Sequence, residues 1–143
     1  MGQYVAPLRD MHFVLHELLQ VEDELKQLPA HADMDADTIN QVLEEGSKFA
    51  SNILFPLNHS GDKEGCHHNK ETLTVTTPKG FKEAYKQYVE AGWAALACDP
   101  NYGGQGLPLI VNNSFYEMIN SAKFDGRTAY KETVHNKLIK DKR

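Results

Sequence analysis

The chain has 143 residues, of which 41% are hydrophobic and 24% are charged, a composition typical of one globular domain. Residues 1–122 contain 8 Lys and Arg against 17 Asp and Glu, a net charge of −9, whereas residues 123–143 carry a net charge of +4. Because an acidic body repels phosphate, we expect no nucleic-acid partner, and no apolar run approaches the length of a membrane span.

The first helix is predicted to begin at Leu8, because apolar residues recur with helical spacing from there to Leu25. Pro29 should end this helix, since proline lacks the backbone N–H that the helix needs. An acidic loop follows. In it, Asp35 or Asp37 can accept a hydrogen bond from the free N–H groups that start the next helix.

The second helix is predicted over residues 39–54, where apolar residues follow a 3, 4, 7 spacing. Pro56 should end or kink it near Phe55. Residues 58–70 are polar and are expected to form a loop. Residues 72–75 alternate polar and apolar side chains, which indicates one short extended segment.

The third helix should begin at Thr77 and Pro78, a capping residue followed by proline at the first helical position. Gly92 should end it. Apolar spacing predicts a fourth helix over residues 109–122. Four helices and little else predict an all-α fold, a small up-and-down bundle of about four helices.

A glycine-rich loop, residues 92–108, joins the third and fourth predicted helices and contains the only tryptophan of the chain. Gly103, Gly104 and Gly106 fall within four positions. The backbone there must take positive φ or pass close to a group that a Cβ would block. Such loops often carry function, and the alternative is a tight helix-to-helix connection without a ligand.

The histidines and cysteines do not form a metal-binding pattern. His12 and His16 lie four residues apart on a predicted helix, but no third ligand accompanies them. Cys66, His67 and His68 are adjacent, and adjacent residues cannot easily converge on one tetrahedral ion. We therefore expect no metal. The two cysteines are also too few for a disulfide framework, so we expect a cytoplasmic protein.

Five separated segments form an ordered set of motifs. They are residues 4–11 (YVAPLRDM), 13–15 (FVL), 76–85 (TTPKGFKEAY), 92–93 (GW) and 102–108 (YGGQGLP). Together they resemble one branch of the acyl-CoA dehydrogenase family, the branch that includes methylthiopropanoyl-CoA dehydrogenase. The likeness extends over about residues 3–122.

The resemblance implies an N-terminal helical domain, a middle β-domain and a C-terminal four-helix domain, with FAD between the last two. In the family, a glutamate of the C-terminal domain takes the α-proton of the acyl-CoA while the flavin takes the β-hydride. This sequence matches the first domain only, as residues 1–122, and residues 123–143 form a basic tail without a family match. We therefore expect no catalytic residue, no cofactor-binding residue and no FAD bound by this chain alone. Glu117, the one acid of the fourth helix, does not match the family's base.

The resemblance also implies that the helix after the glycine-rich loop lines the acyl pocket. The residues expected to line it are Phe115, Tyr116, Met118 and Ile119. The loop residues expected near the site are Tyr102, Gly103, Gly104 and Gly106. The alternative is that the four helix residues form the core of an isolated domain.

We expect a truncated N-terminal domain of an acyl-CoA dehydrogenase-like flavoprotein, without dehydrogenase activity of its own. An uncovered apolar face should favour self-association or contact with a larger acyl-CoA dehydrogenase-like chain. The alternative is a stand-alone helical module that binds acyl-CoA or another protein, with the basic tail as a contact arm or a solvated end. A third possibility is that the tail arose by truncation or a frameshift and that the chain has no selected function.

Overall fold

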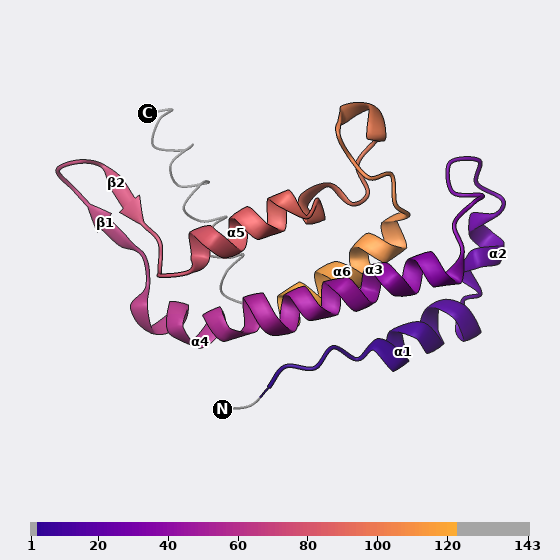
Figure 1. Ribbon diagram of the computed structural model, residues 1–143, viewed down its shortest axis with the longest axis horizontal. Helices are drawn as coiled ribbons and strands as arrows, with labels where there is room; N and C mark the ends of the chain where they lie inside the picture. Colours follow the sequence, from indigo (N-terminus) through magenta and orange to yellow (C-terminus); the bar gives the residue numbers. More distant parts are fainter. Residues whose placement is uncertain (1–2, 123–143) are drawn as a thin grey trace.

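The longest feature of the fold is a helical rod from Ala36 to Glu64 (Figure 1). It consists of α3 (Ala36–Phe49), a π-helical segment (Ala50–Leu54) and α4 (Phe55–Glu64). The computed structural model describes residues 3–122. The predicted basic tail, residues 123–143, lies outside the described residues.

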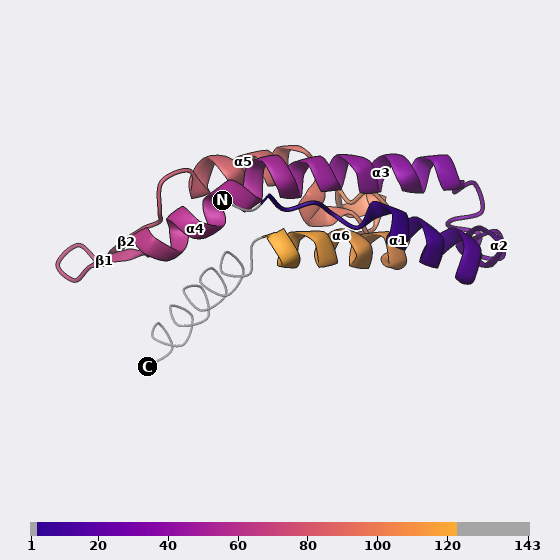
Figure 2. The ribbon, with the colours of Figure 1, turned by 90° about the horizontal axis from the view of Figure 1, so that it is seen from below.

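Asp35 and Pro56 explain how the rod begins and how it continues. The Asp35 side chain accepts a hydrogen bond from the backbone N–H of Thr38 at 2.8 Å, so Asp35 is the capping residue. The helix does not end at Pro56 but bends there, as the kink alternative predicted, and runs on to Glu64 (Figure 2), so the first part of the expected polar loop is helical. Pro56 lies in the first turn of α4, directly after the π-helical segment, and prolines and π-turns are the usual sites at which a helix kinks without ending.

The N-terminal helical region is not the single helix that its apolar spacing predicts. α1 (Leu8–His12) continues into a second π-helical segment (Phe13–Leu18), and α2 (Val21–Leu25) follows after a break. Gln20 makes this break, because its φ of 48° is left-handed and cannot continue a helix. The spacing hides the break because the apolar residues Leu18, Val21 and Leu25 keep a helical spacing across it.

A small antiparallel hairpin replaces the rest of the expected loop. β1 (His67–Asn69) pairs with β2 (Thr74–Thr76), and His68 lies opposite Val75. The alternating residues predicted β2 but not β1, because histidine and asparagine carry little strand signal.

α5 (Phe81–Glu90) begins three residues after Pro78, so the predicted start at Thr77 and Pro78 is wrong. Gly80, with a φ of 87°, sets the direction of the helix instead. Gly92 follows the end of α5 with a φ of 76°, and this confirms the predicted helix end.

α6 (Leu109–Ala122) has the predicted bounds and packs along the rod (Figure 2). The contact is close at Gly46 of α3, where a Cβ atom would lie 2.7 Å from the ring of Phe115. The core lies between these two helices, and its fully buried members include Ile39, Leu43 and Met118. The predicted all-α fold, a small helical bundle, is therefore confirmed. Within residues 3–122, no helix has the length and apolarity that crossing a membrane requires.

Candidate functional site

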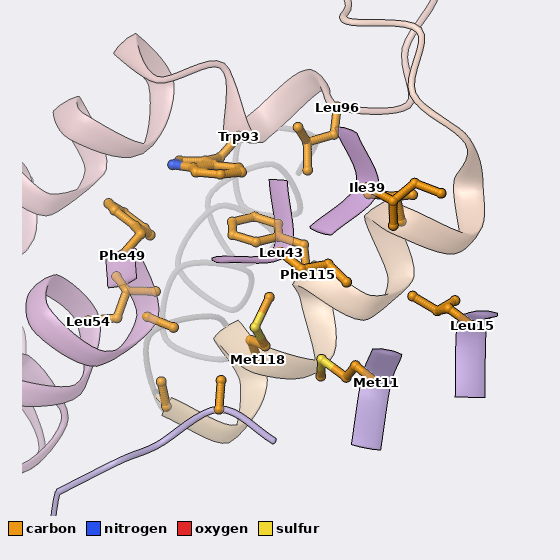
Figure 3. Close-up of a cluster of buried hydrophobic side chains, with 14 of the residues drawn as sticks. Met11, Leu15, Ile39, Leu43, Phe49, Leu54, Trp93, Leu96, Phe115 and Met118 are labelled. Atoms are coloured by element: carbon orange, nitrogen blue, oxygen red, sulfur yellow. The ribbon is translucent and has the colours of Figure 1, made fainter. Parts of the chain in front are cut away.

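Stacked aromatic rings anchor the start of the glycine-rich loop to α6 (Figure 3). The rings of Trp93 and Phe115 are stacked, with centroids 4.4 Å apart and planes 19° from parallel. Phe49 and Tyr88 extend this cluster, with ring centroids 6.2 Å from Trp93 and 6.4 Å from Phe115 respectively. The first residue of the loop that carries a side chain is thus fixed to the centre of α6.

Backbone hydrogen bonds close the loop on itself. The N–H of Gln105 donates to the Ala95 carbonyl at 3.0 Å, and the N–H of Leu107 donates to the Leu96 carbonyl at 2.8 Å. Between them, the N–H of Gly106 donates to the carbonyl of Cys98 at 2.9 Å. The outgoing arm of the loop therefore lies against the incoming arm, and the tip between them has a fixed shape.

The predicted glycine conformations of this loop are confirmed. Gly103 and Gly106 have φ values of 82° and 66°, which glycine adopts without strain. Gly104 instead allows a close approach, because a Cβ there would lie 2.0 Å from the carbonyl oxygen of Cys98. Tyr102 stands at the tip, and its side chain is 89% exposed.

The four α6 residues of the expected acyl site divide into two pairs. Phe115 and Met118 are fully buried in the core between α6 and the rod (Figure 3). Tyr116 and Ile119 are half-buried and reach the molecular surface. Only Tyr116 and Ile119 are therefore placed to contact a molecule outside the core.

Tyr4 lies near Glu117 and Ser121, in the C-terminal half of α6. The Tyr4 ring packs near Phe55, with centroids 6.1 Å apart. Burial raises the pKa of the Tyr4 hydroxyl, and the negative charge of Glu117 raises it further, while the nearby Ser121 hydroxyl opposes the shift. Glu117 itself is exposed, so it is not enclosed in the kind of site that a catalytic base occupies.

A polar link that the sequence does not reveal joins three elements of the N-terminal half. His16 contacts the Glu22 carboxylate through Nδ1 and the Asn40 amide oxygen through Nε2, the latter at 2.7 Å. The ring of His12 lies 5.8 Å from that of His16. Within the described chain, no three histidine, cysteine or acidic side chains are grouped as metal ligands. Helical spacing pairs His16 with His12 only, so its partners on α2 and α3 could not be predicted.

The aromatic cluster does not fit a flavin. A flavin ring binds by stacking on a free flat face, but the facing sides of Trp93 and Phe115 are already in contact. Phe115 is also fully buried, so neither of its faces is open to a ligand. We therefore derive no catalytic step through FAD from residues 3–122.

Three known proteins match most of the chain. The 3-methylmercaptopropionyl-CoA dehydrogenase of Ruegeria pomeroyi is 35% identical over 119 residues, 83% of this chain. The broad-specificity linear acyl-CoA dehydrogenase FadE5 of Mycobacterium tuberculosis is 30% identical over 122 residues, 85% of this chain. The butyryl-CoA dehydrogenase of Syntrophomonas wolfei is 31% identical over 121 residues, 83% of this chain. No protein-family model matches the chain.

The chain is therefore a homologue of the acyl-CoA dehydrogenases. It spans 20% of the length of each of these relatives, and its helical architecture fits an N-terminal segment of such a protein. This confirms the resemblance seen in the five motifs.

Proposed function

We propose that residues 3–122 act as the N-terminal helical domain of an acyl-CoA dehydrogenase-like protein, and that this chain alone does not desaturate acyl-CoA. The observation that carries the proposal is homology over 83% of the chain to only 20% of a dehydrogenase. FAD, in this proposal, belongs to the parts of the relatives that the chain does not match. The acyl-CoA class of substrate comes from the names of all three relatives.

The proposed contribution to substrate binding is one wall of an acyl pocket. Tyr116 and Ile119 form this wall on α6, and Phe115 and Met118 hold the helix in place from the core. The proposal also assigns to this site the loop residues Tyr102, Gly103, Gly104 and Gly106, on the basis of the family resemblance alone. One wall buries little of an acyl chain, and binding needs most of the ligand surface covered.

Calorimetric titration of the 143-residue chain with butyryl-CoA and a longer acyl-CoA tests this proposal. We expect no saturable heat, because the remaining walls of the pocket are missing. Saturable binding would instead favour a stand-alone acyl-CoA-binding module. In that case Ile119→Ser should weaken binding, whereas Asn113→Ser, on the exposed side of α6, should leave it unchanged.

One observation favours this second candidate. The core closes within residues 3–122, because Leu43, Phe115 and Met118 are fully buried without any further domain. A helical unit with a closed core can fold and bind a ligand or a protein on its own.

A further inference from the structure

The outer side of the N-terminal helical region carries an apolar stripe. Phe13, Val14 and Leu18, all on the π-helical segment, have exposed fractions of 51%, 40% and 65%. Two exposed acids, Asp10 and Glu17, lie on the same turns of the helix. No other part of residues 3–122 buries these three side chains, so the stripe is open to a partner.

The stripe lies at the acidic end of the molecule. Residues 1–45 contain 10 Asp and Glu against 2 Lys and Arg, a net charge of −8. Residues 1–122 as a whole carry −9, so nearly all of the net negative charge lies on residues 1–45, which include α1, α2 and the first part of α3. These elements lie together at one end of the structure (Figure 1). A partner for this stripe should therefore be apolar on one side and basic beside it.

Residues 123–143 of the same chain have this pattern. Tyr130, Val134 and Leu138 recur every four residues, the spacing of an apolar helix face. Lys131 and Lys137 stand beside them, in a segment with 7 Lys and Arg against 3 Asp and Glu. Amphipathic segments of this type bind apolar grooves through residues spaced in this way.

The segment is also long enough to reach the stripe. It follows Ala122, the last residue of α6, and α6 measures about 21 Å for its 14 residues. Val134 and Leu138 follow Ala122 by 12 and 16 residues, about 18 and 24 Å at helical rise and more where the chain is extended, so they can run back along α6. Met11 of α1 lies in the same buried cluster as Met118 of α6 (Figure 3), so α1 is within this range.

We propose that residues 127–140 fold back onto the chain that carries them and cover the apolar stripe. Val134 and Leu138 then pack on Phe13 and Leu18, and the lysines face the flanking acids. The proposal concerns the tail alone and does not depend on acyl-CoA binding. A second copy of the chain or a larger dehydrogenase are the competing occupants of the stripe.

Hydrogen exchange of the full 143-residue chain at low salt tests this proposal. The measured amides are those of residues 10–19, compared between the unmodified chain and the double variant Lys131→Glu with Lys137→Glu. We expect their exchange to rise about threefold to tenfold in the variant, because like charges now face each other. The matched control is Lys70→Glu with Lys79→Glu, which makes the same charge change away from the stripe and should leave these amides unaffected.

A charge swap supplies the second arm of the experiment. Adding Asp10→Lys and Glu17→Lys to the Lys131 and Lys137 double variant should restore the original protection. Unchanged exchange in the double variant, or failure of the swap to restore it, would overturn the proposal. Protection that grows with protein concentration would also overturn it, because it would place another copy on the stripe.

Discussion

Gly104 shows how a single residue determines the shape of the candidate site. The two arms of the glycine-rich loop cross there, and a Cβ would lie 2.0 Å from the carbonyl oxygen of Cys98. The obstacle is backbone rather than the end of a flexible side chain, so it cannot move aside without opening the loop. The sequence predicted that this loop needs glycine, since three glycines within four positions indicate a backbone that side chains would obstruct. The sequence could not show which of these glycines allows a close backbone approach and which adopts a positive φ.

Gly104→Ala should therefore destabilise the fold by about 2–3 kcal/mol, as overpacking of a fixed site does. The new methyl group forces apart the hydrogen bonds that join Gly106 to Cys98 and Leu107 to Leu96. Urea unfolding followed by Trp93 fluorescence measures this loss. The control is Gly103→Ala, where no atom lies within 4 Å and only the φ of 82° is unfavourable, at about 1 kcal/mol. Equal losses in the two variants would contradict the role given to Gly104.

Phe115→Ala should lower the free energy of unfolding by about 3–5 kcal/mol, the usual cost of a large cavity in a core. Its ring is fully buried between Trp93 and Gly46. The neighbouring change Tyr116→Ala, at a half-buried position, should cost clearly less in the same urea experiment. A larger loss for Tyr116→Ala would contradict the division of α6 into core and surface residues.

At the scale of elements, local sequence signals predicted the start of α3, the end of α5 and both bounds of α6, but not the start of α5 or the break at Gln20. α6 has the predicted bounds because its apolar side chains alone decide its burial. The rod bends near Pro56 and continues to Glu64, because a proline beside a π-turn kinks a helix without ending it. The break at Gln20 has no sequence signal, since a left-handed glutamine depends on the tertiary contacts around it.

The start of α3 makes a pH-dependent contribution that can be measured. The hydrogen bond from Thr38 lowers the pKa of the Asp35 carboxyl below its ordinary value, so folding favours the charged form. This stabilisation is complete above the pKa of the unfolded chain and is lost as the pH falls through the folded value. Asp35→Ala should therefore lower the thermal midpoint at pH 7 and have a smaller effect near pH 2.5. An effect of equal size at both values would contradict a charge-dependent cap.

At the scale of the whole molecule, the chain is a helical unit with a closed core and several exposed apolar side chains. Tyr102 and Leu109 are among them, at the tip and at the end of the glycine-rich loop. The five motifs allowed the family to be inferred from sequence, because they place glycines, prolines and aromatics in a distinctive order along the chain. The partition of α6 between core and surface could not be inferred, since it depends on how closely α3 approaches at Gly46.

Self-association is expected, because Tyr102 and Leu109 present apolar surface that a dehydrogenase-like partner would cover. Light scattering at increasing protein concentration should give a mass above the 16.1 kDa of one chain. The double variant Tyr102→Ser with Leu109→Ser should shift the mass toward the monomer. A monomeric mass for the unmodified chain at high concentration would contradict this expectation.

Catalytic turnover tests the central proposal most directly. The purified chain is mixed with FAD, 3-methylmercaptopropionyl-CoA and an artificial electron acceptor, and the dehydrogenase of Ruegeria pomeroyi serves as the positive control. We predict that the acceptor is reduced no faster than in a protein-free blank, because the chain matches only 20% of each relative and the proposal assigns FAD to the rest of their length. Reduction that exceeds the blank and rises in proportion to the concentration of the chain would contradict the proposal.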